Sequence, residues 1–257
     1  GPVGFTPGTG TDITVTTNPY AVSGLTDNTE YDFYITGNCS ATNVSAQVGP
    51  LSGRTTCLAF AIPFSEGFNS TSSTQDCWTV VDANGDGDAW DMNYAFNTSE
   101  GDEVAAISTD FNGGADDDYL ISPAITLTGN ERVRYDYRVQ STGEPNDMEV
   151  LISTGTNALA DFTTQILPVT NFANVTYMTE SIDLSAYTGD VYIAWRIPPG
   201  TTDGWRMYID NVRFETIPNC DEPLMLSTSN ITTTDVDIAW TEQGASTAWE
   251  IEYGAVG

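Results

Sequence analysis

The stretch Trp205-Arg-Met-Tyr-Ile-Asp-Asn-Val-Arg-Phe214 decides the fold class of this chain. Trp205, Met207 and Ile209 occupy alternate positions, and such alternation is typical of a β-strand with one buried face. Asp210-Asn211 then breaks the phase before Val212 and Phe214, as a β-bulge does. The sequence therefore predicts a bulged strand in this region.

Other segments show the same alternation between turns rich in Gly, Asn, Asp and Pro, and no segment is typical of a long helix. One apolar face is shared by Val133, Tyr135, Tyr137 and Val139, and another by Val191, Ile193, Trp195 and Ile197. The chain is predicted to be all-β. Residues 58–219, which carry most of these strands, are predicted to form a jelly-roll β-sandwich.

Composition limits the classes of function. The 257 residues are 40% hydrophobic and 11% aromatic, which is typical of globular domains. The chain holds 36 acidic residues and seven arginines, with no lysine or histidine, and its net charge is -29. That charge disfavours binding to nucleic acid or to anionic lipid. It favours bound cations or a calcium-containing medium, although acidic residues can also serve solubility alone.

We expect no catalytic role. Without histidine the chain cannot form a Ser-His or Cys-His pair. A glycosidase that uses two carboxylates stays formally open, but no residue pattern marks such a pair. No apolar run approaches the ~20 residues of a membrane span, so no direct membrane insertion is expected.

The two ends of the chain are predicted to be complementary halves of one type of domain. Leu25-Thr-Asp-Asn-Thr-Glu-Tyr31 resembles the corner signature of fibronectin type III domains, in which the tyrosine hydroxyl bonds back to the backbone. Residues 1–57, with a further strand at Ile13 and Val15, are then a C-terminal half. Residues 220–257 resemble the N-terminal half, with two early strands, Trp240 in the core and a strand at 249–253. The two halves are expected to belong to successive type III domains of a longer chain. The alternative is that both halves close into one type III domain.

A short repeat supports a tandem array. Gly254-Ala-Val-Gly257 resembles Gly1-Pro-Val-Gly4, at an offset of 253 residues. Self-similarity at a fixed period is the mark of repeat architectures. We therefore expect this chain to be one period of a longer protein.

Residues 58–219 resemble the cleaved-adhesin jelly roll of gingipain haemagglutinin/adhesin regions and other bacterial surface proteins. The resemblance is carried, in the order of the family, by Phe64-Ser-Glu-Gly-Phe68, Cys77-Trp-Thr-Val-Val-Asp-Ala-Asn-Gly-Asp-Gly-Asp-Ala-Trp90, Asp118-Tyr-Leu-Ile-Ser-Pro123 and Met207-Tyr-Ile-Asp-Asn-Val212. It implies extracellular, calcium-stabilised domains that bind host or environmental ligands, without catalysis. Alternation with type III domains also resembles surface proteins exported by the type IX pathway.

Calcium is the expected cofactor. The loop residues Asp82, Asn84, Asp86 and Asp88 place oxygen ligands at alternate positions, with glycines that let the loop curl. The loop lacks the final glutamate and the helices of an EF-hand, and a solvated acidic turn is the alternative. Glu66 and Asp210 match family positions and form a second candidate metal pair. Asp116-Asp117-Asp118 is expected to be a repulsive loop rather than part of a calcium site.

The arginines suggest a ligand-binding face. Arg132, Arg134 and Arg138 lie opposite the apolar face of their strand. With Arg196 and Arg206 on neighbouring strands of the same sheet, they would form a patch for an acidic glycan or a partner carboxylate. Local pairing with Asp and Glu is the alternative. The candidate ligand-binding residues are Arg134, Arg138, Arg196 and Arg206.

Four cysteines without a C-x-x-C motif indicate disulfides and an oxidising, extracellular setting. Cys57 and Cys77 bracket the entry to the predicted jelly roll and are expected to pair. In a tandem array, Cys220 would pair with the equivalent of Cys39 in the next copy.

The predicted function is that of a repeat unit of a large extracellular bacterial adhesin. Its partners would be a glycan, a surface protein or neighbouring copies of itself. The alternative is a carbohydrate-binding or spacer region of a secreted polysaccharide-degrading enzyme, because a fold does not fix a function.

Overall fold

The computed structural model describes residues 1–40, 42–109, 116–202, 204–218, 220, 222–242 and 246–254. The chain is all-β, as predicted, with two short 3-10 turns, η1 (Gln75–Cys77) and η2 (Leu159–Asp161). The strands in chain order are β1 (Glu30–Ile35), β2 (Asn38–Ser40), β3 (Asn43–Val44), β4 (Val48–Arg54), β5 (Phe64–Glu66), β6 (Thr79–Asp82), β7 (Asp91–Tyr94), β8 (Val104–Ser108), β9 (Asp118–Ile121), β10 (Ile125–Leu127), β11 (Glu131–Val139), β12 (Asn146–Ser153), β13 (Thr164–Phe172), β14 (Met178–Asp183), β15 (Gly189–Ile197), β16 (Arg206–Thr216), β17 (Leu224–Ser229) and β18 (Asp237–Thr241).

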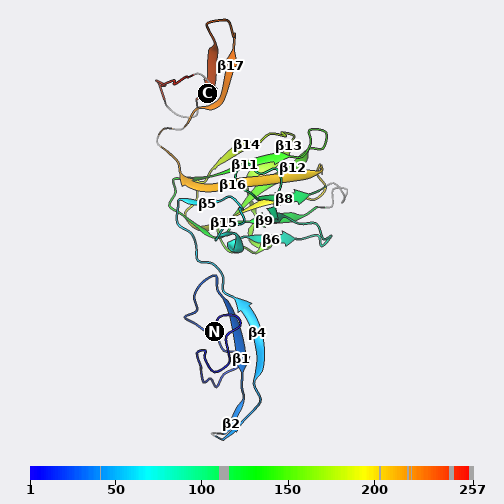
Figure 1. Cartoon of the computed structure of the whole chain (residues 1–257), viewed down its shortest axis with the longest axis vertical. Helices are drawn as coiled ribbons and strands as arrows, with labels where there is room; N and C mark the ends of the chain where they lie inside the picture. The colour runs from blue at the N-terminus through cyan, green and yellow to red at the C-terminus, as the bar shows by residue number, and fades with distance from the viewer. Residues whose placement is uncertain are drawn as a thin grey trace.

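The central part of the chain is a sandwich of two six-stranded antiparallel sheets (Figure 1). The first, here called the β15 sheet, has the order β13-β12-β15-β9-β6, and β10 also pairs with β15. The second, the β16 sheet, has the order β14-β11-β16-β8-β7, and β5 also pairs with β16. Antiparallel sheets can bury one face and leave the other in water. The predicted jelly-roll sandwich is confirmed.

The alternating residues that predicted the strands fill the space between the sheets. Val133, Tyr135, Tyr137 and Val139 of β11 are buried, as are Val191, Ile193, Trp195 and Ile197 of β15. Trp195 joins the two layers, because its ring lies 5.4 Å from that of Tyr135 and 5.7 Å from that of Trp78. Burial of a large apolar side chain contributes roughly 1.5–3 kcal/mol, so these rows are a major source of stability.

A bulge interrupts β16 where the sequence predicts it. Arg134 of β11 pairs with Arg213, whereas Asp136 pairs with Asp210. Asn211 and Val212 therefore lie opposite the single residue Tyr135. Asn211 has a φ of 51°, in the left-handed region that asparagine tolerates better than most residues. The bulge returns Val212 to the buried face.

The N-terminal segment carries the predicted tyrosine corner. The Tyr31 hydroxyl accepts a hydrogen bond of 3.0 Å from the backbone amide of Thr26. β1 pairs with β4, but residues 11–17 form no strand, and Ile13 and Val15 are 49% and 43% exposed. The strand predicted at Ile13 and Val15 was wrong because alternation alone does not supply a neighbouring strand to pair with.

The C-terminal segment contains the antiparallel pair β17 and β18. The strand predicted at 249–253 does not form, and Tyr253 is 93% exposed. Trp240 is half-buried against Trp249, with ring centroids 5.5 Å apart, rather than enclosed in a core. Both predictions required a second layer of strands, which the described part of this segment does not provide.

The two terminal hairpins form separate sheets and lie on opposite sides of the sandwich in Figure 1. The boundaries at residues 57 and 219, and the assignment of the ends to type III halves, stay predictions. The predicted four-residue repeat falls partly on residues 255–257, outside the described residues. In the described part of the chain, no helix has the length and apolarity needed to cross a bilayer.

Candidate calcium site and arginine residues

The predicted calcium loop follows β6 and curls as its glycines allow. The Asp82 carboxylate accepts hydrogen bonds from the amides of Gly85, at 2.6 Å, and Gly87, at 3.0 Å. Both glycines have positive φ values, of 76° and 95°, which other residues rarely adopt. Asp86 accepts from the Asn84 side chain at 2.6 Å and from the Asp88 amide at 2.8 Å. Several oxygen-bearing side chains therefore lie on one short curl.

Asp118 adds a buried carboxylate beside this loop. It begins β9, and its register partner in β6 is Asp82. Asp118 is 0% exposed, and neither of its carboxylate oxygens has a hydrogen-bond partner among the described residues. Burial, followed by the charges of Asp86 and Asp116, raises the pKa of Asp118 to about 7; the charge of Asp82 adds to this and the Asp117 amide opposes it.

This environment suits a cation. A buried carboxylate without a hydrogen-bond donor is costly, and a metal ion is one of the few partners that can compensate it. Calcium takes six to eight oxygen ligands in a flexible geometry, which Asp82, Asp86 and Asp118 with backbone oxygens and water could supply. Across the ranges that the structure describes, no three acidic side chains already converge to metal-holding distance. The loop would therefore have to tighten around an ion.

Asp118 was predicted to lie in a loop of mutually repelling carboxylates; the repulsion is present, but the loop placement was wrong. Asp118 is a strand residue, and only the pairing of β6 with β9 brings it beside Asp82. The neighbouring Asp117 does not share this position, because its carboxylate pairs with Arg196 at 2.7 Å. Alternation of side chains along a strand predicts that Asp117 and Asp118 point to opposite faces, but only once the strand is known to begin at Asp118.

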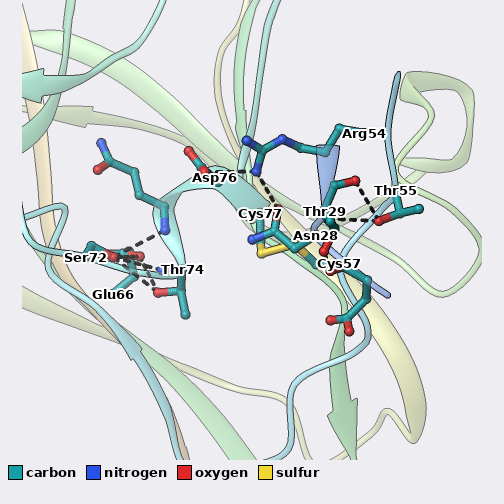
Figure 2. The surroundings of a disulfide bond; sticks show 12 residues. Asn28, Thr29, Arg54, Thr55, Cys57, Glu66, Ser72, Thr74, Asp76 and Cys77 are labelled. Atoms are coloured by element: carbon teal, nitrogen blue, oxygen red, sulfur yellow. Dashed lines mark hydrogen bonds and ion pairs between the residues drawn. A yellow bond between two sulfur atoms is a disulfide. The ribbon is translucent and has the colours of Figure 1, made fainter. Parts of the chain in front are cut away.

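Glu66, from the second predicted metal pair, is 2% exposed and satisfied by the protein. It accepts hydrogen bonds from the Ser72 hydroxyl at 2.8 Å and the Thr74 hydroxyl at 2.6 Å (Figure 2). The Phe68 amide also donates to it, at 2.7 Å. These donors belong to the segment that leads into η1. Glu66 therefore holds this segment against β5.

Asp210, the other member of that pair, is bound by a different loop. It accepts hydrogen bonds from the amides of Ser99, at 2.7 Å, Glu100, at 3.3 Å, and Asn211, at 2.7 Å. Burial raises the pKa of Asp210 to about 6, against the effect of these amides. The hydrogen bonds of Glu66 and Asp210 share no residue, and a metal role for the pair stays a prediction.

The arginines of β11 point away from the core, as predicted, but two of them are paired. Arg132 lies 2.8 Å from Glu215 and 3.3 Å from Glu222. Arg134 lies 3.6 Å from Glu215 and also forms an ion pair with Glu222. For these two residues the structure shows the local pairing that was the alternative to a ligand-binding role.

Arg196 lies in the other sheet. It belongs to β15, whereas Arg134, Arg138 and Arg206 belong to the β16 sheet. Its guanidinium pairs with Asp117 at 2.7 Å and Glu149 at 2.8 Å. The expectation that the four arginines share one sheet was therefore wrong, because strand order cannot be read from alternation.

Arg138 and Arg206 remain together on the outer face of the β16 sheet. Arg206 lies over the ring of Tyr94, 4.7 Å from its centroid. Arg138 lies over the rings of Tyr208, at 5.4 Å, and Tyr177, at 5.9 Å. A guanidinium in this position is attracted by the ring electrons, which fixes its orientation.

The predicted disulfide between Cys57 and Cys77 is confirmed, with the two Cα atoms 5.7 Å apart (Figure 2). It joins the end of the N-terminal hairpin to η1. Arg54 supports the junction, because it contacts Asp76 at 3.1 Å and Asn28 at 2.9 Å. Cys39 and Cys220 are both free and exposed in this chain, so their pairing between successive copies stays a prediction.

Comparison with protein families identifies the class of the sandwich. Residues 61–214, more than half of the chain, match the Cleaved Adhesin Domain. The chain therefore belongs to this adhesin family, and the predicted resemblance is confirmed.

Relatives and solved structures agree with this assignment. The chain is 31% identical over 195 residues to Hemagglutinin A of Porphyromonas gingivalis strain ATCC BAA-308 / W83, a match that covers 63% of this chain and 9% of that protein. A second Hemagglutinin A of Porphyromonas gingivalis is 30% identical over 196 residues and is covered to 7%. The K1 cleaved adhesin domain of Lys-gingipain from Porphyromonas gingivalis W83 has the same fold, with a TM-score of 0.50 and 22% identity, over 61% of this chain and 99% of that domain.

Proposed function

We propose that this chain is a calcium-stabilised adhesive unit of a large extracellular bacterial surface protein. The observation that carries the proposal is the match of residues 61–214 to the Cleaved Adhesin Domain. The chain spans less than a tenth of the haemagglutinins that it resembles, so their activity enters here only as a proposal. We assign an adhesive rather than a catalytic role because the family is named for an adhesin domain and these relatives are named haemagglutinins.

Calcium supports the adhesive unit in this proposal. Asp82, Asp86 and Asp118, with Asn84 and Asp88 from the same loop, are the residues that would hold the ion. The unpartnered oxygens of Asp118 favour this placement over a merely solvated turn. When bound, calcium supplies the positive charge that this cluster lacks.

Adhesion by such a unit would depend on the number of copies. When several weak sites are linked, binding at one site raises the effective concentration at the next. The net charge of -29 keeps neighbouring units apart and soluble. We propose that the parent protein uses this unit in several copies, exposed outside the cell.

Beads that display many copies of the chain test the adhesive role. We expect them to adhere to erythrocytes in calcium and to lose adhesion in excess chelator. Beads that carry an unrelated protein of similar negative charge are the control for non-specific attachment. Equal adhesion of both kinds of bead, or none in either condition, would contradict the proposal.

A further inference from the structure

Two of the seven arginines lack a carboxylate partner in the described part of this highly acidic chain. The ion-paired ones are Arg54, Arg132, Arg134, Arg196 and Arg213. Arg138 and Arg206 instead contact tyrosine rings. In a chain with 36 acidic residues, an arginine without a carboxylate is unexpected if it serves only to balance local charge.

These two arginines and three tyrosines form one continuous row, here called the Arg-Tyr row. It runs across the outer face of the β16 sheet from Arg206 over Tyr94 to Tyr208, then to Arg138 and Tyr177. The rings of Tyr94 and Tyr208 lie 5.9 Å apart, and the arginine-to-ring distances are 4.7–5.9 Å. Tyr208, in the middle of the row, is fully buried, whereas Phe96, 5.7 Å from Tyr94, is 67% exposed.

The Arg206 guanidinium has N–H groups left over from its hydrogen bonds within the described chain. Its Nε and Nη2 donate to the Ser108 hydroxyl at 3.1 and 2.6 Å, and its Nη1 donates to the Tyr94 hydroxyl at 2.7 Å. A guanidinium has five N–H groups, so one on each terminal nitrogen is left. These two can bind both oxygens of one carboxylate.

Arg206 lines a hollow of about 200 Å³. Gly87, Ala89 and Ala106 leave the space, because their side chains are small or absent. Tyr94, Ser108 and Arg206 line the same hollow, together with Asp88 and Asp91. It therefore combines an aromatic ring, a guanidinium and carboxylates within a space suited to one small ring.

We propose that this hollow binds an acidic saccharide, with the sugar carboxylate on Arg206 and the sugar ring against Tyr94. Asp88 and Asp91 would accept hydrogen bonds from the sugar hydroxyls. A peptide carboxylate fits less well, because it brings negative charge near these aspartates without hydroxyl groups to offer them. The inference rests on the proposed adhesive function and names its ligand class.

The position of the hollow also links it to the candidate calcium site. Gly87 and Asp88 belong to the loop in which Asp82 and Asp86 lie near Asp118. An ion that tightens this loop would fix one wall of the hollow. Measurements are therefore best made in calcium.

Calorimetric titration of the whole chain tests the inference. The probes are a tetrasaccharide of alternating glucuronic acid and N-acetylglucosamine, its carboxyl-methylated ester, and tetraglutamate. We expect the acidic tetrasaccharide to bind at least about tenfold more tightly than the ester or the peptide, because only it can form the charged bidentate contact and offer hydroxyls.

Variants assign that binding to the hollow. We expect Arg206→Gln to weaken binding of the acidic tetrasaccharide by about tenfold or more, and Arg206→Lys, which keeps the charge but not the fork, to weaken it similarly. Arg54→Gln, an equal change of charge at an exposed site far along the chain, should alter it by less than about twofold. If Arg206→Gln does not fold, Arg206→Lys decides the question.

Several results would overturn the inference. They are no binding of the acidic tetrasaccharide, equal binding of the ester or the peptide, or wild-type affinity in both Arg206 variants. Beads that carry Arg206→Gln and still adhere to cells would overturn the saccharide site while leaving the adhesive function intact. Failure of the wild-type beads to adhere would instead count against the proposed function itself.

Discussion

At the scale of single residues, Asp118 gives the sharpest prediction, because replacing it should change the melting temperature in opposite directions with and without calcium. Its carboxylate is fully buried without a hydrogen-bond partner in the described chain. In chelator, Asp118→Asn should raise the melting temperature, since it removes an uncompensated charge. In calcium, the same variant should melt below the wild type, since it removes a ligand of the ion. Thermal unfolding in both conditions measures this.

Asp12→Asn is the matched control for that experiment, because Asp12 is exposed and lies in the N-terminal segment. It removes the same charge and should leave the difference between calcium and chelator unchanged. A variant at Asp118 that destabilises equally in both conditions would show that this carboxylate has only a structural role.

Glu131 is a buried carboxylate with the opposite environment, and it predicts a dependence on pH. It is 3% exposed and accepts hydrogen bonds from the Thr128 hydroxyl and from the amides of Thr128, Gly129 and Asn130. Burial acts to raise the pKa of Glu131, but these bonds outweigh it and hold the pKa below its usual value of 4.5. The carboxylate therefore stabilises the fold above pH 4.5, and this contribution is lost as the pH falls through the lowered pKa.

We expect Glu131→Gln to lower the free energy of unfolding by about 1.5–3 kcal/mol at pH 7, the range for hydrogen bonds to charged groups. The difference from the wild type should shrink as the pH is lowered below 4.5. Denaturant unfolding across pH measures this, with the exposed Glu144→Gln as control. A difference that stays constant with pH would contradict the assignment.

At the scale of elements, the Cys57–Cys77 disulfide joins the N-terminal hairpin to η1 beside the contact of Arg54 with Asp76. The bond closes a loop with a sequence separation of 20. In the chain-entropy model, a loop of about this length contributes roughly 3 kcal/mol to the free energy of unfolding. We expect reduction of this bond to lower that free energy by a similar amount.

The test is denaturant unfolding with and without reductant, in a chain that carries Cys39→Ser and Cys220→Ser. Both of these cysteines are free and exposed, so only the Cys57–Cys77 bond then responds to reductant. Unchanged unfolding after verified reduction would show that the junction does not depend on the disulfide.

Strands were predicted correctly from the sequence where one face packs against the core and the other face does not. The alternation in β11, β15 and β16 reflects one face against the core, and the bulge at Asn211 appears as a break in that phase. The same alternation failed at Ile13 and at 249–253, where no strand in the described part of the chain pairs with the segment. Arg196 and Asp118 could not be placed either, because strand order and register arise from the whole fold.

At the scale of the whole molecule, the net charge of -29 predicts a specific response to salt. Monovalent salt screens repulsion between exposed charges and should raise the melting temperature modestly. Calcium at the same ionic strength should raise it further, by binding the native state. At a hundredfold excess over Kd, binding at one site adds about 2.7 kcal/mol to the free energy of unfolding.

Calorimetric melting in sodium, magnesium and calcium chloride at equal ionic strength separates screening from binding. Magnesium is the matched divalent control, because it requires a tighter octahedral geometry than this loop offers. Equal melting temperatures in magnesium and calcium would indicate general charge compensation instead of a calcium site.

The most direct measurement of the calcium-stabilised unit is a calorimetric titration of calcium into the chelator-treated chain. We predict saturable binding in the wild type and in Asp12→Asn, and its loss in Asp118→Asn. Absence of binding in the wild type, or the same affinity in Asp118→Asn, would contradict the placement of calcium beside Asp82, Asp86 and Asp118.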